Sequence, residues 1–381
     1  MMNNFKYCTY LICFVFLSCT NRNNIVKDII FIDVDKIEST IIDSVSIKEV
    51  SYVLLETKPE CLIGNIHKLM ITDSMIYVFD KLDTKTIFCF DKDGKFIYKI
   101  DKIGKGPGEY LDVLDFDVDE KEIVYVYDNA RKKLITYWDK AKLFSEKDMK
   151  HRFFEFAIID NSHILISDSW EAGGLYKRLS VLGTEKQNVT PMFRQRKIYD
   201  SPGIVSFCNH YLYKSNDIIF SYRFSNVVYK FKENKLQPIF SFKEELIPDK
   251  KFITKLIENP MWDYKDDTYL LDITNVYENE DHFMMDIIKG MPTSCIINKK
   301  SLNVKRTFLY QNSKLIGLSN LSVKAFDNNL FVSILDVRDV ATDKFIMNID
   351  KTTLPDSIKN RFYNLKEGDN PVLIYFNLKN N

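Results

Sequence analysis

The chain has 381 residues, of which 45% are hydrophobic and 28% are charged, and this composition is typical of a globular protein with a substantial core. Its 28 Phe and 21 Tyr, against 12 Gly and 10 Pro, exclude a disordered or collagen-like chain and favour β-strands. The 53 basic residues are balanced by 53 acidic ones, so the basic excess that usually accompanies nucleic-acid binding is absent, and we expect no nucleic-acid partner.

The first residues predict export. Lys6 precedes an apolar run at residues 7–17, which is shorter than the about 20 helical residues that span a bilayer. Residues 1–18 therefore predict a signal peptide. Leu17-Ser18-Cys19 resembles a bacterial lipobox, although Phe16 stands where that motif prefers Leu. The resemblance implies lipid attachment at Cys19; the alternative is an ordinary signal peptide with a chance cysteine. Residues 19–44 would then be a tether ahead of the folded domain at 45–381.

The body of the chain repeats itself. Residues 66–98 and 111–139 share one pattern, in which three apolar strands are separated by polar turns and the second strand ends in aspartate. These aspartates, Asp80 and Asp128, are 48 residues apart, and Asp168 follows after another forty. Recurring units of this length, built from short strands, are typical of β-propeller blades.

Weaker copies follow at residues 210–242 and 323–339, and the region between them can supply a further unit. In the copy at 210–242, Arg223 stands near the place of the aspartate. The spacing predicts an all-β chain folded as a six-bladed β-propeller of four-stranded antiparallel blades. Two stacked β-sandwiches are the alternative, which explains the aromatic content but not the in-register aspartates.

The segments between strands carry turn chemistry. Asp93-Gly94 predicts a type I′ hairpin, and Asp327-Asn328-Asn329 has a similar role. One short helix is predicted within residues 244–257, interrupted by Pro248. The isolated strand at residues 50–56 should pair into the last blade, because a ring of blades otherwise leaves an open sheet edge.

The segment Gly104-Lys-Gly-Pro-Gly-Glu-Tyr110 and the strands after it resemble an NHL-type repeat. Together with Cys19 and the strands near both ends, they make the mature chain similar to bacterial six-bladed propeller lipoproteins of the NHL/TolB-like kind. The resemblance implies the propeller fold and a lipid anchor in the outer membrane, facing the periplasm or the cell surface. It says little about function, since propellers host both binding and catalysis.

Ligands of propellers are expected at the ring's centre, where loops of every blade converge. A repeat position that departs from the pattern, such as Arg223, is a candidate for function. We therefore predict a central ligand pocket lined by His67, Lys105, Tyr110, Asp112 and Arg223. The alternative for Tyr110 and its neighbour Glu109 is that they only brace the turn between two blades.

Two functions remain open at this stage. The first is a lipid-anchored envelope module, without catalysis, that binds a peptide, a glycan or a partner protein. The second is a metal-dependent, lactonase- or lyase-like enzyme, whose metal would lie in the channel near His67, Asp112, Asp115, Glu155 and His210. The five histidines are too few and too dispersed for an obvious metal site, so we favour the binding module and expect neither metal nor cofactor.

Overall fold

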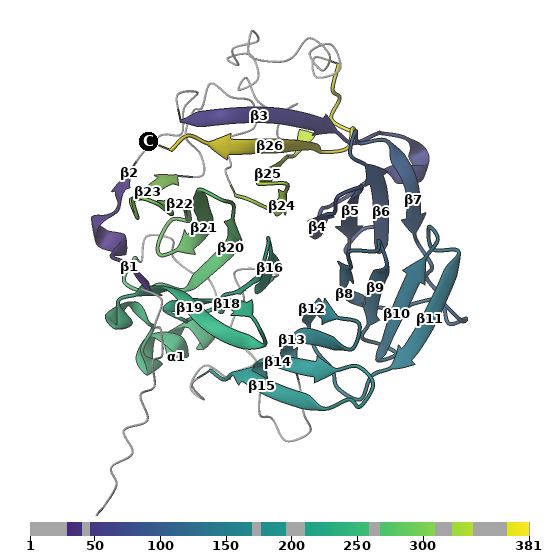
Figure 1. Ribbon diagram of the computed structural model, residues 1–381, viewed down its shortest axis with the longest axis horizontal. Helices are drawn as coiled ribbons and strands as arrows, with labels where there is room; N and C mark the ends of the chain where they lie inside the picture. The colour runs from purple at the N-terminus through teal and green to yellow at the C-terminus, as the bar shows by residue number, and fades with distance from the viewer. Residues whose placement is uncertain are drawn as a thin grey trace, which may run out of the picture.

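In a computed structural model the chain forms six antiparallel sheets arranged as blades around a central axis (Figure 1). The structure describes residues 29–39, 46–169, 177–195, 210–258, 267–308, 322–337 and 364–380. The prediction of a six-bladed propeller with four-stranded antiparallel blades is confirmed. Each blade has its first strand nearest the axis, and these inner strands are β4, β8, β12, β16, β20 and β24.

The first three blades follow the chain order from the axis outward. Blade 1 consists of β4 (Lys68–Ile71), β5 (Met75–Asp80), β6 (Thr86–Asp91) and β7 (Phe96–Ile100). Blade 2 consists of β8 (Val113–Val118), β9 (Val124–Asp128), β10 (Lys133–Trp138) and β11 (Leu143–Asp148). Blade 3 consists of β12 (Glu155–Asp160), β13 (His163–Ser169), β14 (Lys177–Gly183) and β15 (Val189–Phe193).

Blades 4 and 5 each gain a fifth strand from the N-terminal segment. Blade 4 consists of β16 (Leu212–Lys214), β17 (Ile218–Phe220), β18 (Val227–Lys232) and β19 (Lys235–Phe242), with β1 (Ile30–Ile32) parallel to β19. Blade 5 consists of β20 (Asp272–Glu278), β21 (His282–Ile288), β22 (Thr293–Asn298) and β23 (Val304–Phe308), with β2 (Glu38–Ser39) parallel to β23. These parallel additions were not predicted, and they cover two outer edges that would otherwise lie open.

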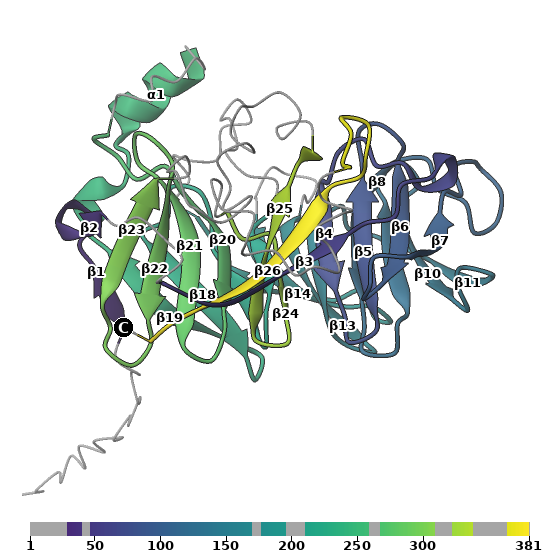
Figure 2. The same cartoon turned by 90° about the horizontal axis from the view of Figure 1, so that it is seen from above.

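Blade 6 closes the ring with strands from both ends of the chain. It consists of β24 (Ala325–Asp327), β25 (Leu330–Leu335), β26 (Val372–Leu378) and, outermost, β3 (Ile47–Leu54). β26 and β3 pair antiparallel from Val372↔Leu54 to Leu378↔Ile47, and they lie side by side in Figures 1 and 2. The expected closure by an N-terminal strand is therefore confirmed.

Short helices complete the described chain. The 3-10 turns are η1 (Val34–Lys36), η2 (Pro59–Cys61) and η4 (Glu244–Leu246), and the α-helix is α1 (Lys250–Glu258). Pro248 separates η4 from α1 as predicted, because proline cannot continue the helix. α1 buries Ile253 and Leu256, and it projects beyond the strand ends in the side view of Figure 2. The part of the chain that the structure describes has no helix long and apolar enough to cross a membrane.

The core lies between neighbouring blades, so most middle strands are buried on both faces. In β5, Ile76 to Asp80 are all buried. This explains why the sequences of such strands are nearly continuous apolar runs and do not alternate between apolar and polar residues. Aromatic rings fill the spaces between blades: Phe79 of blade 1 meets Phe116 of blade 2 edge to face, with ring centroids 5.8 Å apart.

Of two hairpin turns predicted from the sequence, one has the type I′ geometry and the other does not. Asn328 and Asn329 have φ of 44° and 71° and form a two-residue hairpin between Asp327 and Leu330, as a type I′ turn requires. At the other turn Gly94 has φ of 81°, but Asp93 does not have a positive φ. That turn is therefore not type I′: the chain closes through Gly94 N to Asp91 O at 3.0 Å, with a register shift that absorbs the additional residue.

The in-register aspartates have a structural role in blades 1 and 2. Asp80 Oδ2 accepts the amide of Gly64 at 2.9 Å, and Asp128 Oδ2 accepts the amide of Leu111 at 3.0 Å. Each carboxylate thus holds the segment that leads into the inner strand of its own blade. Asp168 differs, because its carboxylate accepts from Arg178 and from the Tyr222 hydroxyl, both at 2.8 Å.

Candidate functional site

A cavity of about 1610 Å³ lies on the axis of the ring, and we call it the axial cavity. All six blades contribute inner-strand residues to its lining, and the hairpin loops that follow the inner strands of blades 1 to 4 and 6 contribute as well. Exposed residues of these loops, such as Asp73, Asn161 and Asn216, are part of the lining, so the cavity opens to solvent at this end of the ring.

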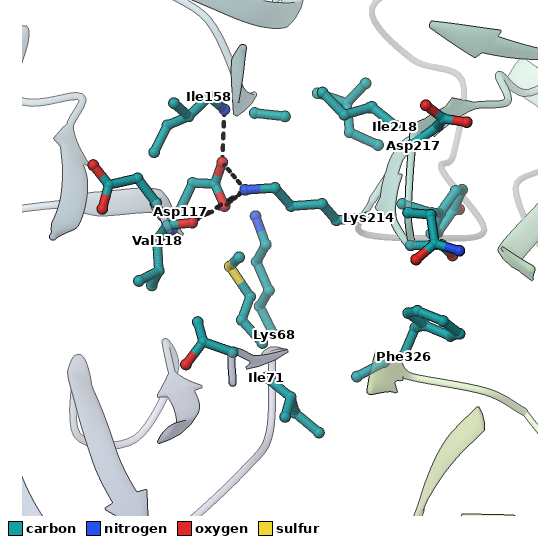
Figure 3. A pocket seen from close by; sticks show the side chains of 18 of the residues that line it. Lys68, Ile71, Asp117, Val118, Ile158, Lys214, Asp217, Ile218 and Phe326 are labelled. Carbon is teal, nitrogen blue, oxygen red and sulfur yellow. Dashed lines mark hydrogen bonds and ion pairs between the residues drawn. The ribbon is translucent and has the colours of Figure 1, made fainter. Parts of the chain in front are cut away.

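Apolar side chains from five blades surround the interior of the cavity. This apolar collar, labelled in Figure 3, consists of Ile71, Val118, Ile158, Ile218 and Phe326. The collar residues stand at or near the end of an inner strand, or at the start of the strand after it, so the propeller repeat brings them to one level of the axis.

An ion pair crosses the cavity inside this collar (Figure 3). Lys214 Nζ, from β16 of blade 4, lies 2.9 and 3.0 Å from the two carboxylate oxygens of Asp117, from β8 of blade 2. Lys214 also donates to the Val118 carbonyl at 3.1 Å. The Asp117 side chain is 2% exposed, whereas that of Lys214 is 37% exposed. The pair joins two inner strands that are not neighbours in the ring.

A second, more buried pair lies beside it. Lys68 Nζ of β4 donates to Asp115 Oδ1 and to the Phe116 carbonyl, each at 2.8 Å. Burial opposes the positive charge of Lys68, but the nearby carboxylates of Asp115, Glu155 and Asp117 outweigh it and raise the lysine pKa. Burial also raises the pKa of Asp115, against the effect of Lys68. The ammonium group of Lys68 therefore stays charged across the physiological range.

Inner-strand carboxylates also satisfy the open edge of the next inner strand. Asp115 accepts the amide of Phe156 at 2.9 Å, and Asp117 accepts that of Ile158 at 2.6 Å, both on β12. Glu155 of β12 in turn accepts the amide of Tyr211, just before β16, at 2.9 Å. An innermost strand has one edge without a β-partner, so these side chains replace the missing ladder bonds.

Two histidines of the lining, His67 and His210, lie in contact just before the inner strands β4 and β16, at the end of the cavity away from the hairpin loops. His210 Nε2 lies 2.8 Å from the His67 carbonyl and Nδ1 lies 3.2 Å from Glu155, while the two imidazole rings are 5.1 Å apart. Burial, with His210, Lys81 and Lys68 nearby, lowers the pKa of His67 to about 3. His67 is consequently neutral at physiological pH.

The structure separates the five predicted pocket residues. His67 lines the axial cavity, whereas Lys105, Tyr110, Asp112 and Arg223 are outside its lining. Lys105 is exposed, and Asp112, just before β8, accepts from Asn129 Nδ2 at 3.3 Å.

Arg223 lies on the face of the Tyr222 ring, with its guanidinium carbon 5.6 Å from the ring centre, and Arg178 stacks on the same ring at 5.2 Å. These residues therefore converge on Tyr222 rather than on the cavity. The predicted lipid-bearing Cys19 lies outside the described residues.

Tyr110 and the glycine-rich segment before it serve the junction between blades 1 and 2. The Tyr110 hydroxyl lies 2.8 Å from the carbonyls of both Lys85 and Ile100, and the ring is fully buried. Glu109 accepts the amide of Gly106 at 2.6 Å, and its carboxylate lies where a Cβ on Gly104 would stand. Gly108 has φ of +69° and packs against the Phe144 ring. The motif behind the NHL-like resemblance is thus a structural brace.

Asp115 was predicted from the sequence as a potential metal ligand, but it is engaged by Lys68, and Asp117 on the same strand is engaged by Lys214. The sequence predicted no role for Lys68, Lys214 or the apolar collar. A lysine in a short β-strand carries no signal of its own, and its partner lies far along the chain. Across the described residues, no group of three or more His, Cys, Asp or Glu side chains is placed to hold a metal ion.

Comparisons with known proteins support the fold. A family model described as a domain of unknown function, DUF4934, matches residues 29–377. The crystal structure of a Bacteroides fragilis protein that is predicted to be exported is 20% identical, with a TM-score of 0.71, over 92% of this chain and 99% of that one. A DUF4221 family member from Bacteroides vulgatus is 9% identical, with a TM-score of 0.54, over 88% and 98%. No curated protein matches the chain.

Proposed function

The chain belongs to the DUF4934 family, and we propose that it is a non-catalytic binding module of the bacterial cell envelope that holds a peptide, a glycan or a segment of a partner protein in its axial cavity. The observation that carries this proposal is the cavity itself. At about 1610 Å³ it exceeds the roughly 300–1,000 Å³ of sites for small molecules, and all six blades line it. Such a site suits an extended ligand that touches several loops at once.

The polar groups of the cavity favour binding over metal-dependent hydrolysis. A metal-activating centre needs carboxylates or imidazoles that converge and remain available as ligands. Asp115 and Asp117 are instead neutralised by Lys68 and Lys214, and Glu155 holds the backbone of the next blade. These groups are used within the fold, which leaves the loops and the apolar collar as the surface for a ligand.

The proposed location is the outer membrane, with the chain anchored through lipid on Cys19 and facing either the periplasm or the cell surface. The signal-like residues 1–18 and the lipobox-like Leu17-Ser18-Cys19 support this proposal. The predicted export of the similar Bacteroides fragilis protein agrees with it.

Site-specific photo-crosslinking in the native host tests the binding role. A photoreactive residue at Asn161, an exposed lining position, should give a discrete adduct, whereas the same residue at Leu82, which is 72% exposed and outside the lining, should not. The adduct should disappear when Ile158→Arg places a charged chain in the apolar collar.

The matched control is Leu143→Arg, which changes an exposed leucine on the outer strand β11. This variant should keep the Asn161 adduct. Equal adducts at Asn161 in the wild type and the Ile158→Arg variant, with both proteins folded, would refute the axial cavity as the binding site.

A further inference from the structure

The hairpin loops around the axial cavity are acidic. Each of the six inner strands has a carboxylate at its last residue or in the loop that follows, namely Asp73, Glu120, Asp160, Asp217, Glu280 and Asp327, and all of these except Glu280 line the cavity. The same positions contain two lysines, Lys121 and Lys214. This contrasts with the whole chain, in which basic and acidic residues balance. The charge asymmetry therefore belongs to this end of the ring.

Part of this acidity is compensated within the fold, and part of it faces solvent. Lys230 lies 3.4 Å from Asp217, and Lys92 lies 2.7 Å from Asp327. Asp73 and Glu120, in the loops of blades 1 and 2, are exposed and line the cavity. Carboxylates that surround a concave, low-dielectric surface focus a negative potential there and attract cations.

The chain itself places an ammonium group on a carboxylate inside the cavity. Lys214 crosses from blade 4 to Asp117, and its side chain remains 37% exposed while it does so. The interior of the cavity therefore accommodates a primary amine on an alkyl chain that runs past the apolar collar, as Figure 3 shows. A lysine side chain of a ligand has the same shape and chemistry.

The lining favours a peptide over a sugar. Sugar sites commonly stack a ring of the ligand on an exposed aromatic face, but the lining rings of Phe156, Phe231, Tyr213 and Tyr277 are buried. The one collar residue with a ring, Phe326, is half-buried among the aliphatic side chains of the apolar collar. A peptide with alternating apolar and basic side chains matches this lining, because its apolar side chains can contact the collar while its basic side chains lie at the acidic loops.

Building on the proposed binding role of the axial cavity, we infer that its ligand is a cationic peptide segment of a partner protein, with lysine or arginine side chains at the acidic loops and apolar side chains in the collar.

Fluorescence anisotropy with labelled synthetic peptides tests this inference on the full mature protein. The probes are a short lysine–leucine peptide, its glutamate–leucine counterpart and a neutral oligosaccharide. The lysine–leucine peptide should bind, and its affinity should fall as salt shortens the Debye length from about 30 Å at 0.01 M to about 8 Å at 0.15 M. The other two probes should not bind.

Charge-removing variants locate the effect. Asp73→Asn with Glu120→Gln should weaken the lysine–leucine peptide by about threefold to tenfold at low salt, as expected for two exposed charge contacts. The control, Glu60→Gln with Asp148→Asn, removes the same charge from exposed positions outside the lining and should leave the affinity unchanged. Ile158→Arg should abolish binding.

The outcomes separate this inference from the proposed function. If the lysine–leucine peptide fails to bind, or binds equally to the Ile158→Arg variant or to the Asp73/Glu120 variant, the inference is overturned. If the glutamate–leucine peptide or the oligosaccharide binds in its place and Ile158→Arg abolishes that binding, the cationic ligand is refuted while the axial binding site stands. Failure of the Asn161 crosslinking test would refute both the cationic ligand and the axial binding site.

Discussion

Lys214 and Asp117 join blade 4 to blade 2 across the axis, with the lysine Nζ 2.9 and 3.0 Å from the two carboxylate oxygens. Asp117 also accepts the amides of Ile158 on blade 3, at 2.6 Å, and of Val118, at 2.9 Å. One carboxylate thus holds three consecutive blades in register. The two partners are not equivalent, because the aspartate serves more donors and is more deeply buried.

This asymmetry predicts unequal costs of substitution. Asp117→Ala should lower the free energy of unfolding by about 3 kcal/mol or more, since the Lys214 ammonium and two backbone amides lose their acceptor. Lys214→Met should cost less, about 1 kcal/mol, because the lysine is partly exposed, Asp117 keeps both amide donors and the methionine preserves the apolar stem. Urea denaturation measures both values, with exposed Lys232→Met as a control that should stay within about 0.5 kcal/mol. Equal costs for the two substitutions would contradict this account of the pair.

The repeat aspartate Asp128 should be intolerant of an isosteric change. Its buried carboxylate accepts the amides of Leu111, Asp112 and Ala130, so an asparagine amide group would face an amide donor. Asp128→Asn should destabilise the chain by about 2–3 kcal/mol. The matched control is Asp139→Asn, whose carboxylate is exposed and lies 3.9 Å from Lys142, and which should be nearly neutral. Thermal unfolding of the two variants compares them directly.

His67 should make stability depend on pH. Its folded pKa is about 3 against an ordinary value of 6.5, so between these values the unfolded state binds a proton that the folded state does not. Stability is thus full above about pH 6.5 and falls as the pH decreases toward 3, by at most about 1.4 kcal/mol per pH unit.

Urea unfolding at pH 7.5, 6 and 5 checks this slope, with the three pH values chosen to span about the upper half of the window. His67→Gln should flatten it, whereas exposed His163→Gln should leave it as in the wild type. A His67→Gln protein with an unchanged slope would show that other groups govern the acid sensitivity.

Asn370 should be a critical residue of the ring closure. Its side chain donates to the carbonyls of Glu56 and Cys61, at 2.7 and 2.8 Å, and accepts the amide of Ile63 at 2.8 Å. These bonds join the segment before β26 to the link between β3 and blade 1. Asn370→Ala should cost about 3 kcal/mol, because the buried Cys61 carbonyl and two partly buried backbone groups, on Glu56 and Ile63, lose their partner. Exposed Asn303→Ala is the control in the same calorimetric measurement.

Cys19→Ala should release the protein from the membrane fraction, because only the multiple acyl chains of a lipoprotein anchor stably. Cell fractionation followed by mass spectrometry of the N-terminal peptide measures this outcome. Cys13→Ala, within the signal-like segment, is the control and should leave the protein in the membrane fraction. A Cys19→Ala protein that still sediments with membranes after a salt wash would place the anchor elsewhere.

The amino-acid sequence alone determined the architecture, because the relevant signals are local. Strand length, the Asn328-Asn329 hairpin and the 48-residue spacing of Asp80 and Asp128 each arise within one blade or between neighbouring blades. The closing strand β3 was also predictable, since an open ring must cover its edge. The Asp93-Gly94 turn was misread because dipeptide identity does not decide the number of residues in a loop.

Only the tertiary structure decided which polar residues meet. Asp117 and Lys214 are 97 positions apart, and Ile63 and Asn370 are 307 apart. No local pattern predicts either pair. The alternation of side chains along a strand determines the face on which a side chain lies, but it does not determine which blade lies opposite. The same reason separated Arg223 and Asp112 from the cavity that contains His67. Repetition along the chain determined the ring, whereas the contacts across its axis exist only once the ring has closed.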